Sequence, residues 1–311
     1  NTSSSALGIS DNNIIVGTGV YNGQTHAYAM VPARPPFDFD GDGRTEVSVF
    51  RPSNNSWYIS NSFDNSFRAV TFGTTGDKLV PADYDGDGKM DVAVFRPSNN
   101  YWYILQSSNG AVRSQQFGAA GAIPAPGYYD SDDKADLSYF SPSAGTFFQF
   151  YSSDGSFHFQ PWGQSGDVPV VGDYDGDRKA DICVYRATSS SFYYLRSSDG
   201  AGRGFQWGAS GDKPIAGDFD GDSKTDIAVY RPSTGAWYAI RSSDNSFTGI
   251  GWGTAGDIPA AGDYDGDLKL DVAVFRPSSG VFYILQSTNN SLRADQFGTN
   301  GDVPVPSAFV P

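Results

Sequence analysis

Residue types that often carry chemistry are scarce in this chain of 311 residues. It has one cysteine, two histidines and two methionines, and 35 acidic residues outnumber 21 basic ones. A single cysteine excludes a disulfide framework within the chain. Because no basic stripe is present to meet phosphates, we expect no nucleic-acid partner. No apolar run of about 20 residues occurs, so we also expect no membrane insertion.

Catalytic patterns are missing as well. His26 and His158 lie far apart in the sequence, and neither belongs to a Ser-His-Asp or Cys-His arrangement. Cys183 sits in an apolar run and is interpreted as a small buried hydrophobe. The acidic pairs belong to repeated loops, so a glycosidase pair of carboxylates is not indicated. We therefore interpret the protein as non-enzymatic, with no catalytic residues.

What the chain does contain is a repeated acidic pattern, D-x-D-G-D-x-x-x-D. Each copy starts 45 residues after the one before. Intact copies start at Asp38, Asp83, Asp173, Asp218 and Asp263, and a degraded copy starts at Tyr128. One copy alone would be explained equally well by a solvated Asp-Gly turn. Five intact copies at one spacing favour a site that needs the acids.

The chemistry of one copy points to a hard cation. Calcium binds six to eight oxygen atoms, mostly from carboxylates and carbonyls. Gly86 permits a backbone angle that a residue with a Cβ resists. An EF-hand is rejected, because its glycine stands at position 6 and its last acid at position 12. The predicted ligands of this copy are Asp83, Asp85, Asp87, the backbone carbonyl of Lys89, and Asp91.

The other copies supply the remaining predicted ligands, with about five structural Ca²⁺ ions in all. They are Asp38, Asp40, Asp42, Arg44 and Glu46; Asp173, Asp175, Asp177, Lys179 and Asp181; Asp218, Asp220, Asp222, Lys224 and Asp226; and Asp263, Asp265, Asp267, Lys269 and Asp271. Arg44 and the lysines would contribute backbone carbonyls. The degraded copy replaces the first Asp by Tyr128 and the glycine by Ser131, so its acids, Asp130, Asp132 and Asp136, are doubtful ligands.

The same acids account for most of the charge. The ligand positions of the six loops hold 23 of the 35 acidic residues, and the net charge is −14. Five divalent cations, carrying +10 together, would bring it to −4. The acidity is thus interpreted as metal-site charge rather than as a partner-facing patch.

The residues around each loop predict short strands. In the copy around Asp173, strands are expected at 169–172, 181–186, 192–197 and 203–207. No stretch has sustained helical periodicity. Four short antiparallel strands in about 45 residues are typical of one β-propeller blade. The fold class is therefore all-β.

The number of blades depends on the chain ends. Six repeats fill residues 34–300, and residues 301–309 match only the first strand of another repeat. Residues 6–33 contain three strand-like pieces, at 6–10, 13–21 and 25–32. We expect a seven-bladed β-propeller of four-stranded antiparallel blades, a single domain over 1–311. Its last blade would be shared by 6–33 and 301–311. The alternative is a six-bladed ring with a separate N-terminal hairpin.

Two further residue sets recur beside the loops. An arginine follows the second strand at Arg51, Arg96, Arg186, Arg231 and Arg276, with Ser141 in the third repeat. It is interpreted as a structural cation, with ligand binding as the alternative. Aromatic pairs recur on third strands, and aromatic-glycine pairs follow fourth strands, as at Trp207. Most are expected between blades, with a minority lining pockets that stack on sugar rings.

The loop and its 45-residue period resemble the FG-GAP/VCBS repeat family over roughly residues 34–303. That family includes the propeller of integrin α subunits, bacterial secreted VCBS proteins and a fungal seven-bladed calcium-containing lectin. The resemblance implies a propeller with calcium in hairpin loops of successive blades. Binding in such proteins often lies elsewhere, in pockets between blades or on the opposite face. The family is broad in function, so the ligand stays open.

The sequence is compatible with four functions. The first is a non-enzymatic, calcium-stabilised recognition or adhesion propeller that is secreted or on a cell surface, because free calcium is plentiful outside cells. Its partner would be an extracellular glycan or protein. The second is a lectin with sugar sites between blades. The third is a self-associating structural subunit of a surface fibre or layer. The fourth is an ancillary domain of a secreted enzyme such as a polysaccharide lyase.

Overall fold

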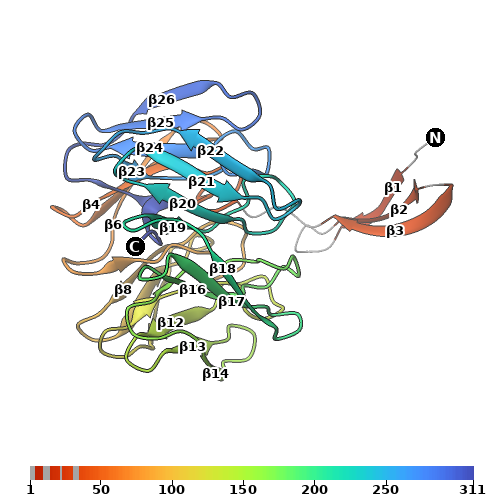
Figure 1. The fold of residues 1–311 in the computed structure, drawn as a ribbon, viewed down its shortest axis with the longest axis horizontal. Coiled ribbons are helices and arrows are strands. Elements are labelled where there is room, and N and C mark those ends of the chain that lie inside the picture. Colours follow the sequence, from red (N-terminus) through yellow and green to blue (C-terminus); the bar gives the residue numbers. More distant parts are fainter. Residues whose placement is uncertain (1–3, 10–14, 22, 31–34) are drawn as a thin grey trace. The chain divides into compact units, whose positions relative to one another are not determined.

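The computed structural model describes residues 4–9, 15–21, 23–30 and 35–311. The chain divides into two compact units, residues 1–34 and residues 35–311. The first unit is a three-stranded antiparallel sheet in the order β1-β2-β3 (Figure 1). Its strands are β1 (Ser4–Ile9), β2 (Ile15–Tyr21) and β3 (Gln24–Met30). The three predicted strands are confirmed, while their expected turns at 11–12 and at Asn22 lie outside the described residues.

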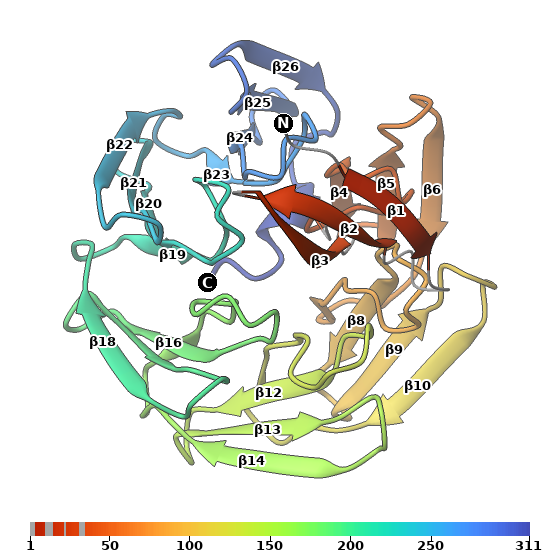
Figure 2. The ribbon, with the colours of Figure 1, turned by 90° about the vertical axis from the view of Figure 1, so that its right-hand side faces the viewer.

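The second unit contains six four-stranded antiparallel sheets, which are the blades of a propeller (Figure 2). Blade 1 joins β27 (Val303–Pro304) to β4 (Val47–Arg51), β5 (Ser56–Ser60) and β6 (Phe67–Thr71). Blade 2 is β7 (Lys78–Leu79), β8 (Val92–Arg96), β9 (Tyr101–Leu105) and β10 (Val112–Gln116). Blade 3 is β11 (Ile123–Pro124), β12 (Leu137–Ser141), β13 (Thr146–Phe150) and β14 (Phe157–Pro161).

The remaining blades repeat this arrangement. Blade 4 is β15 (Val168–Pro169), β16 (Ile182–Arg186), β17 (Ser191–Leu195) and β18 (Gly202–Gln206). Blade 5 is β19 (Lys213–Ile215), β20 (Ile227–Arg231), β21 (Ala236–Ile240) and β22 (Phe247–Gly251). Blade 6 is β23 (Ile258–Pro259), β24 (Val272–Arg276), β25 (Val281–Leu285) and β26 (Leu292–Gln296). The all-β propeller of four-stranded antiparallel blades is thus confirmed.

The ring of residues 35–311 closes at six blades, so the seven-bladed count and the closing blade shared by 6–33 and 301–311 were wrong. The strand β27 pairs with β4 rather than with β1–β3. Blade 1 also meets blade 6 directly: the Thr45 N–H donates to the Asp263 carbonyl at 2.6 Å. In the same region, Val49 packs in one cluster with Phe275. No room is left between these blades for a seventh.

The physical reason lies in the first repeat. In blade 2 the Val80 N–H donates to the Ala93 carbonyl beside the first strand. The corresponding residue of the first repeat is Pro35, which has no N–H to donate. The first repeat therefore cannot make this bond, and β27 from the other end of the unit pairs with β4 as the first strand of blade 1. The six-bladed alternative describes this ring.

How deeply each strand is buried depends on its position within the blade. Second strands are buried on both faces, since each blade is packed between two others, and they read as continuous apolar runs such as Val-Ala-Val-Phe. Fourth strands alternate between exposed and half-buried residues at the rim. On third strands, the Trp57 and Trp102 side chains are completely buried. Each indole N–H donates to a backbone carbonyl, of Phe72 and Phe117 respectively.

Residues 305–311 lie against the inner strands, close to the middle of the ring in Figure 2. The short 3-10 helix η1 (Val305–Ser307) follows β27 directly and contacts β4 and β23. Val310 packs against the core of blades 5 and 6, and the Lys213 ammonium donates to the Pro311 carbonyl. These contacts direct the search for a ligand site away from the ring centre. Among the described residues, no helix is long and apolar enough to cross a bilayer.

Candidate metal centres and inter-blade grooves

Each acidic loop directly precedes the second strand of its blade. In the loop at Asp83, the first carboxylate is fixed by the backbone. Its two oxygens accept the Gly86 N–H at 2.6 Å and the Gly88 N–H at 2.9 Å. These glycines have φ angles of +81° and +84°, which bring both N–H groups to the same carboxylate. The predicted role of Gly86 is therefore confirmed by its backbone conformation.

The other intact loops repeat this arrangement. The first acid accepts two N–H groups, from the fourth and sixth loop residues. The sixth residue keeps a positive φ even where it is not glycine, as at Arg178, Ser223 and Leu268. Such φ values are strained for residues with a Cβ. The loop conformation is thus maintained at an energetic cost in three blades.

The last acid of each loop is buried and held from two sides. Asp91 is fully buried; one oxygen accepts the Tyr84 N–H at 3.0 Å and the other the Ser107 N–H at 2.6 Å. Glu46 accepts the Phe39 N–H and the Ser62 hydroxyl in the same way. The carboxylate therefore ties the acidic loop to the hairpin that follows the third strand.

The carboxylates converge as predicted. Groups of acids offer ligand atoms that all lie within 4.8 Å of one another. The groups are Asp38, Asp40, Asp42 and Glu46; Asp83, Asp85 and Asp91; Asp130, Asp132 and Asp136; Asp173, Asp175 and Asp181; and Asp218, Asp220 and Asp226. The loop at Asp263 has the same hydrogen bonds. The backbone carbonyls predicted as ligands, those of Arg44 and the four lysines, remain a prediction.

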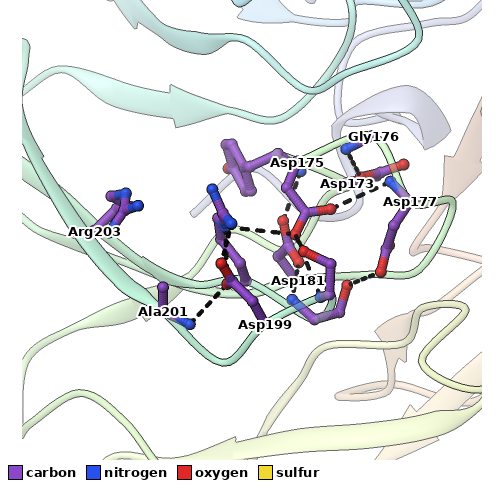
Figure 3. Close-up of polar contacts among 12 residues, drawn as sticks. Asp173, Asp175, Gly176, Asp177, Asp181, Asp199, Ala201 and Arg203 are labelled. Carbon is purple, nitrogen blue, oxygen red and sulfur yellow. Dashed lines mark hydrogen bonds and ion pairs between the residues drawn. The ribbon is translucent and has the colours of Figure 1, made fainter.

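The fifth loop position departs from this convergence in most blades. In Figure 3, Asp173, Asp175 and Asp181 point towards one another, whereas Asp177 lies further out. Asp177 accepts the Ser197 hydroxyl at 2.8 Å. Asp87 and Asp222 likewise accept serine hydroxyls. Their role as metal ligands remains a prediction, whereas Asp42 and, in the degraded loop, Asp132 are fifth-position acids that join a cluster.

A pair of hydroxyl residues was missed by sequence reasoning. It follows the third strand of nearly every blade, and it bonds to the third-, fifth- and ninth-position acids. The pairs are Ser107 and Ser108, Ser152 and Ser153, Ser197 and Ser198, Ser242 and Ser243, and Ser287 and Thr288. The sequence contains the pattern that would have revealed these pairs, because they recur at the same 45-residue period as the acids.

The loops fit a cation. Burial raises the pKa of Asp91 to about 7 and that of Glu46 to about 8, and neighbouring carboxylates add to the shift. An oxygen-only donor set of this kind suits calcium. Two buried oxygens, Asp85 Oδ1 and Asp265 Oδ1, have no hydrogen-bond partner among the described residues. A bound cation would satisfy these atoms and offset the repulsion between the acids.

The degraded loop in blade 3 has a different conformation. Among the described residues, none from 128 to 136 has a positive φ. Tyr128 supplies no carboxylate to collect N–H groups, and Ser131 replaces the glycine. Asp130, Asp132 and Asp136 still cluster. Asp130 and Asp132 border an open cavity of about 510 Å³ that Tyr151 and Lys179 also line.

The recurring arginines pair with an acid that sequence reasoning did not single out. In blade 2, Arg96 Nε and Nη2 donate to the two oxygens of Asp77 at 2.8 and 2.9 Å. The Arg96 Cζ atom lies 4.4 Å from the centre of the Tyr103 ring. The acid belongs to a Gly-Asp turn before the first strand, not to a metal loop. The structural interpretation of these arginines is supported by this buried, two-bond ion pair.

We call this arrangement the Arg-Asp-Tyr triad. Five blades contain it: Arg51, Asp302 and Tyr58; Arg96, Asp77 and Tyr103; Arg186, Asp167 and Tyr193; Arg231, Asp212 and Tyr238; and Arg276, Asp257 and Tyr283. Blade 3 has Ser141, Ala122 and Phe148 at the same repeat positions. All three triad residues are thus replaced in blade 3, which is also the blade with the degraded acidic loop.

Beside the triad of blade 5, an aromatic residue of the preceding blade forms a groove. Between blades 4 and 5, Trp207 packs edge-on against Phe247 with ring centres 5.8 Å apart. Tyr238 stacks on Phe247 at 6.3 Å. With Arg231 and Gln206, these rings line a cavity of about 350 Å³. The third-strand tryptophans are core, as expected, whereas the ring of the aromatic-glycine pair is only half-buried.

The remaining candidate residues carry no site. Cys183 is fully buried, as expected. The His158 ring stacks on Tyr151 at 4.0 Å and bonds to the Ser156 hydroxyl. His26 lies on β3, in the other compact unit.

Comparison with known proteins agrees with this architecture. The family described as FG-GAP-like repeat matches residues 38–94 and 218–274. No curated protein matches the chain. A solved streptogramin B lyase is similar with a TM-score of 0.57 and 10% identity, over 97% of this chain and 88% of that one. A lectin of Agrocybe aegerita, solved for its recognition of non-reducing terminal N-acetylglucosamine, is similar with a TM-score of 0.51 and 14% identity, over 98% and 89%.

At these identities the two solved structures are evidence for the fold alone. The two matched spans together cover four acidic loops, those at Asp38, Asp83, Asp218 and Asp263, and the second strands that follow them. It confirms the resemblance that the loops and their period suggested. The chain contains FG-GAP-like repeats at residues 38–94 and 218–274, within a β-propeller formed by residues 35–311.

Proposed function

We propose that this protein is a calcium-stabilised recognition propeller that works outside cells or at a cell surface and has no catalytic role. Five intact loops would hold the cation through the first, third and ninth acids. Calcium supplies charge neutralisation there. The residues themselves fix the geometry, because backbone N–H groups and serine hydroxyls orient each carboxylate before the cation arrives.

The ligand we propose is a carbohydrate, and the observation that carries this is the cavity between blades 4 and 5. Its walls are aromatic rings, which suit the apolar face of a sugar ring. Arg231 uses Nε and Nη2 for Asp212, and its Nη1 group lies on the other edge of the guanidinium. Nη1 and the Gln206 amide are hydrogen-bond donors for sugar oxygens.

The charge of this groove favours a neutral sugar. Arg231 is paired with an Asp212 side chain that is fully buried, so the two charges cancel locally. An acidic sugar would gain little from a neutralised arginine on a chain of net charge −14. The lectin neighbour is a propeller of the same fold and recognises a neutral sugar, but the proposal rests on the groove itself.

Repetition of the groove would give several weak sites. The triad recurs in five blades, and the groove tryptophan recurs at Trp162, Trp207 and Trp252. Linked sites acting together raise the overall affinity well above that of one site. Multivalent, clustered glycans are therefore the expected ligands.

A glycan array in calcium and in EDTA tests this function. We expect binding to a class of neutral glycans in calcium, with circular dichroism showing that the protein is folded. Silence of the folded, calcium-loaded protein on neutral glycans would contradict the carbohydrate proposal and direct the search to protein ligands.

Two variants localise the site. Trp207→Ala should weaken glycan binding by about tenfold, because one stacked ring contributes roughly 1–1.5 kcal/mol. Phe63→Ala is the matched control: Phe63 is 79% exposed in the hairpin after β5, away from the groove. Equal binding by both variants would contradict the assignment of the groove.

A further inference from the structure

The acidic loops are joined to one another around the ring. In each case a backbone N–H of one loop donates to the backbone carbonyl of the first residue in the preceding loop. The bonds run from Met90 to Asp38 (2.7 Å), Ala135 to Asp83 (2.6 Å), Ala180 to Tyr128 (2.7 Å), Thr225 to Asp173 (2.6 Å), Leu270 to Asp218 (2.7 Å) and Thr45 to Asp263 (2.6 Å).

These bonds connect ligand residues of neighbouring sites. Asp38 offers its carboxylate to one site and its carbonyl to the next loop. The donor of that bond, Met90, directly precedes Asp91, the buried last acid of the next site. A movement of Asp38 towards a cation is therefore transmitted through one hydrogen bond and one peptide unit to Asp91.

A second contact joins the same neighbours. Wherever a loop has glycine at its fourth position, the seventh residue of the next loop extends its side chain over that glycine, and Lys134 of the degraded loop does so over Gly86. A Cβ placed on Gly41 would lie 3.2 Å from Lys89 carbons, and one on Gly221 would lie 2.8 Å from a Lys269 carbon. The close contact leaves little freedom for one loop to change conformation while its neighbour does not.

Blade 3 differs from the other blades in this chain of contacts, because its fourth loop residue is Ser131 rather than glycine. Its loop keeps both hydrogen bonds to its neighbours, but the residue that accepts one of them is Tyr128, which has no carboxylate. Going round the ring, the intact loops form one uninterrupted run. It consists of the loops at Asp173, Asp218, Asp263, Asp38 and Asp83, and the bond from Thr45 to Asp263 joins its last repeat to its first.

We propose that these five loops bind calcium cooperatively as a single run, and that blade 3 is where the coupling stops. The proposal rests on the calcium role proposed above and adds its regulation. Binding at one loop orders the carbonyl or N–H that the neighbouring loop uses, so the neighbour binds with less reorganisation. The protein would then lose its calcium over a narrow concentration range rather than site by site.

The test is a calcium titration with bound calcium measured directly, on the full chain. The wild type should bind about five ions with a Hill coefficient above about 1.5. Two chemically identical variants separate the models: Asp83→Asn removes the last loop of the run and leaves four coupled loops, whereas Asp263→Asn removes the middle loop and leaves two pairs. We expect the Hill coefficient to fall further in Asp263→Asn than in Asp83→Asn.

If the cooperativity came only from folding of the whole chain, the Hill coefficient would fall equally in both variants. Equal Hill coefficients in the two variants would therefore overturn the proposed run of coupled loops. A Hill coefficient of 1 with about five ions would overturn the coupling and leave the calcium role intact. Failure to bind calcium would overturn both proposals.

Discussion

Blade 3 and blade 2 have the same fold but different polar residues. Blade 2 has an intact acidic loop and a complete triad of Arg96, Asp77 and Tyr103. Blade 3 has a degraded loop and no triad, yet its core is as tightly buried: Phe140 and Phe147 are fully inaccessible, like Trp102. Apolar strands are therefore enough to form a blade. The intact acidic loop and the triad are additional features, which blades 1, 4, 5 and 6 share with blade 2.

Removing calcium should have the largest effect, because it makes the other blades resemble blade 3. We expect EDTA to lower the melting temperature by about 10 °C or more, since each cation bound to the folded chain alone adds stability by mass action. Differential scanning calorimetry in excess calcium and in EDTA measures the shift. The same melting temperature in both would contradict a structural role for the loops.

Matched substitutions of the last acid sharpen the comparison. Asp91 and Asp136 are both fully buried and accept equivalent backbone N–H groups. In EDTA, Asp91→Asn and Asp136→Asn should each cost about 1 kcal/mol through a weakened hydrogen bond. In calcium, only Asp91→Asn should cost about 2 kcal/mol more, because a cation is lost. If the two substitutions lowered the free energy of unfolding equally in calcium, the two loops would not differ in metal binding.

The triad can be converted to the form found in blade 3. Asp77→Ala should destabilise the protein by about 2 kcal/mol, since it leaves Arg96 without its partner. Adding Arg96→Ser and Tyr103→Phe reproduces the three residues of blade 3 and should recover at least half of that loss. Urea denaturation measures both variants. A triple variant as unstable as the sum of its parts would show that the triad does not act as a unit.

The pH dependence should be the smallest effect and depends on calcium. Burial raises the pKa of Asp91 and Asp271 to about 7, above the value in the unfolded chain. The folded state then holds protons that the unfolded chain releases, so stability in EDTA should fall as pH rises from about 5 to 8. In calcium the carboxylates are already ionised and the fall should disappear. Urea midpoints at both pH values check this, and an EDTA midpoint that rises with pH would contradict it.

Much of this arrangement follows from the sequence, because one 45-residue period fixes the strands, the acids and the glycines together. The blade count was wrong at the chain ends: residues 301–309 were assigned to a seventh blade, whereas β27 completes blade 1, whose own repeat has Pro35 where blade 2 has the N–H donor Val80. The partner of Arg96 was missed because Asp77 lies in a Gly-Asp turn, where acids are common without a role. The altered backbone of the loop at Tyr128 was not predicted, although the loss of the first carboxylate at Tyr128 and of the glycine at Ser131 was visible in the sequence.

The count of bound calcium ions tests the account most directly. The protein is dialysed to equilibrium in calcium, and bound metal is measured per chain. The account gives five, one for each intact loop and none for the loop at Tyr128. Six would contradict the distinction of blade 3, and one or none would contradict the proposal that calcium stabilises the propeller.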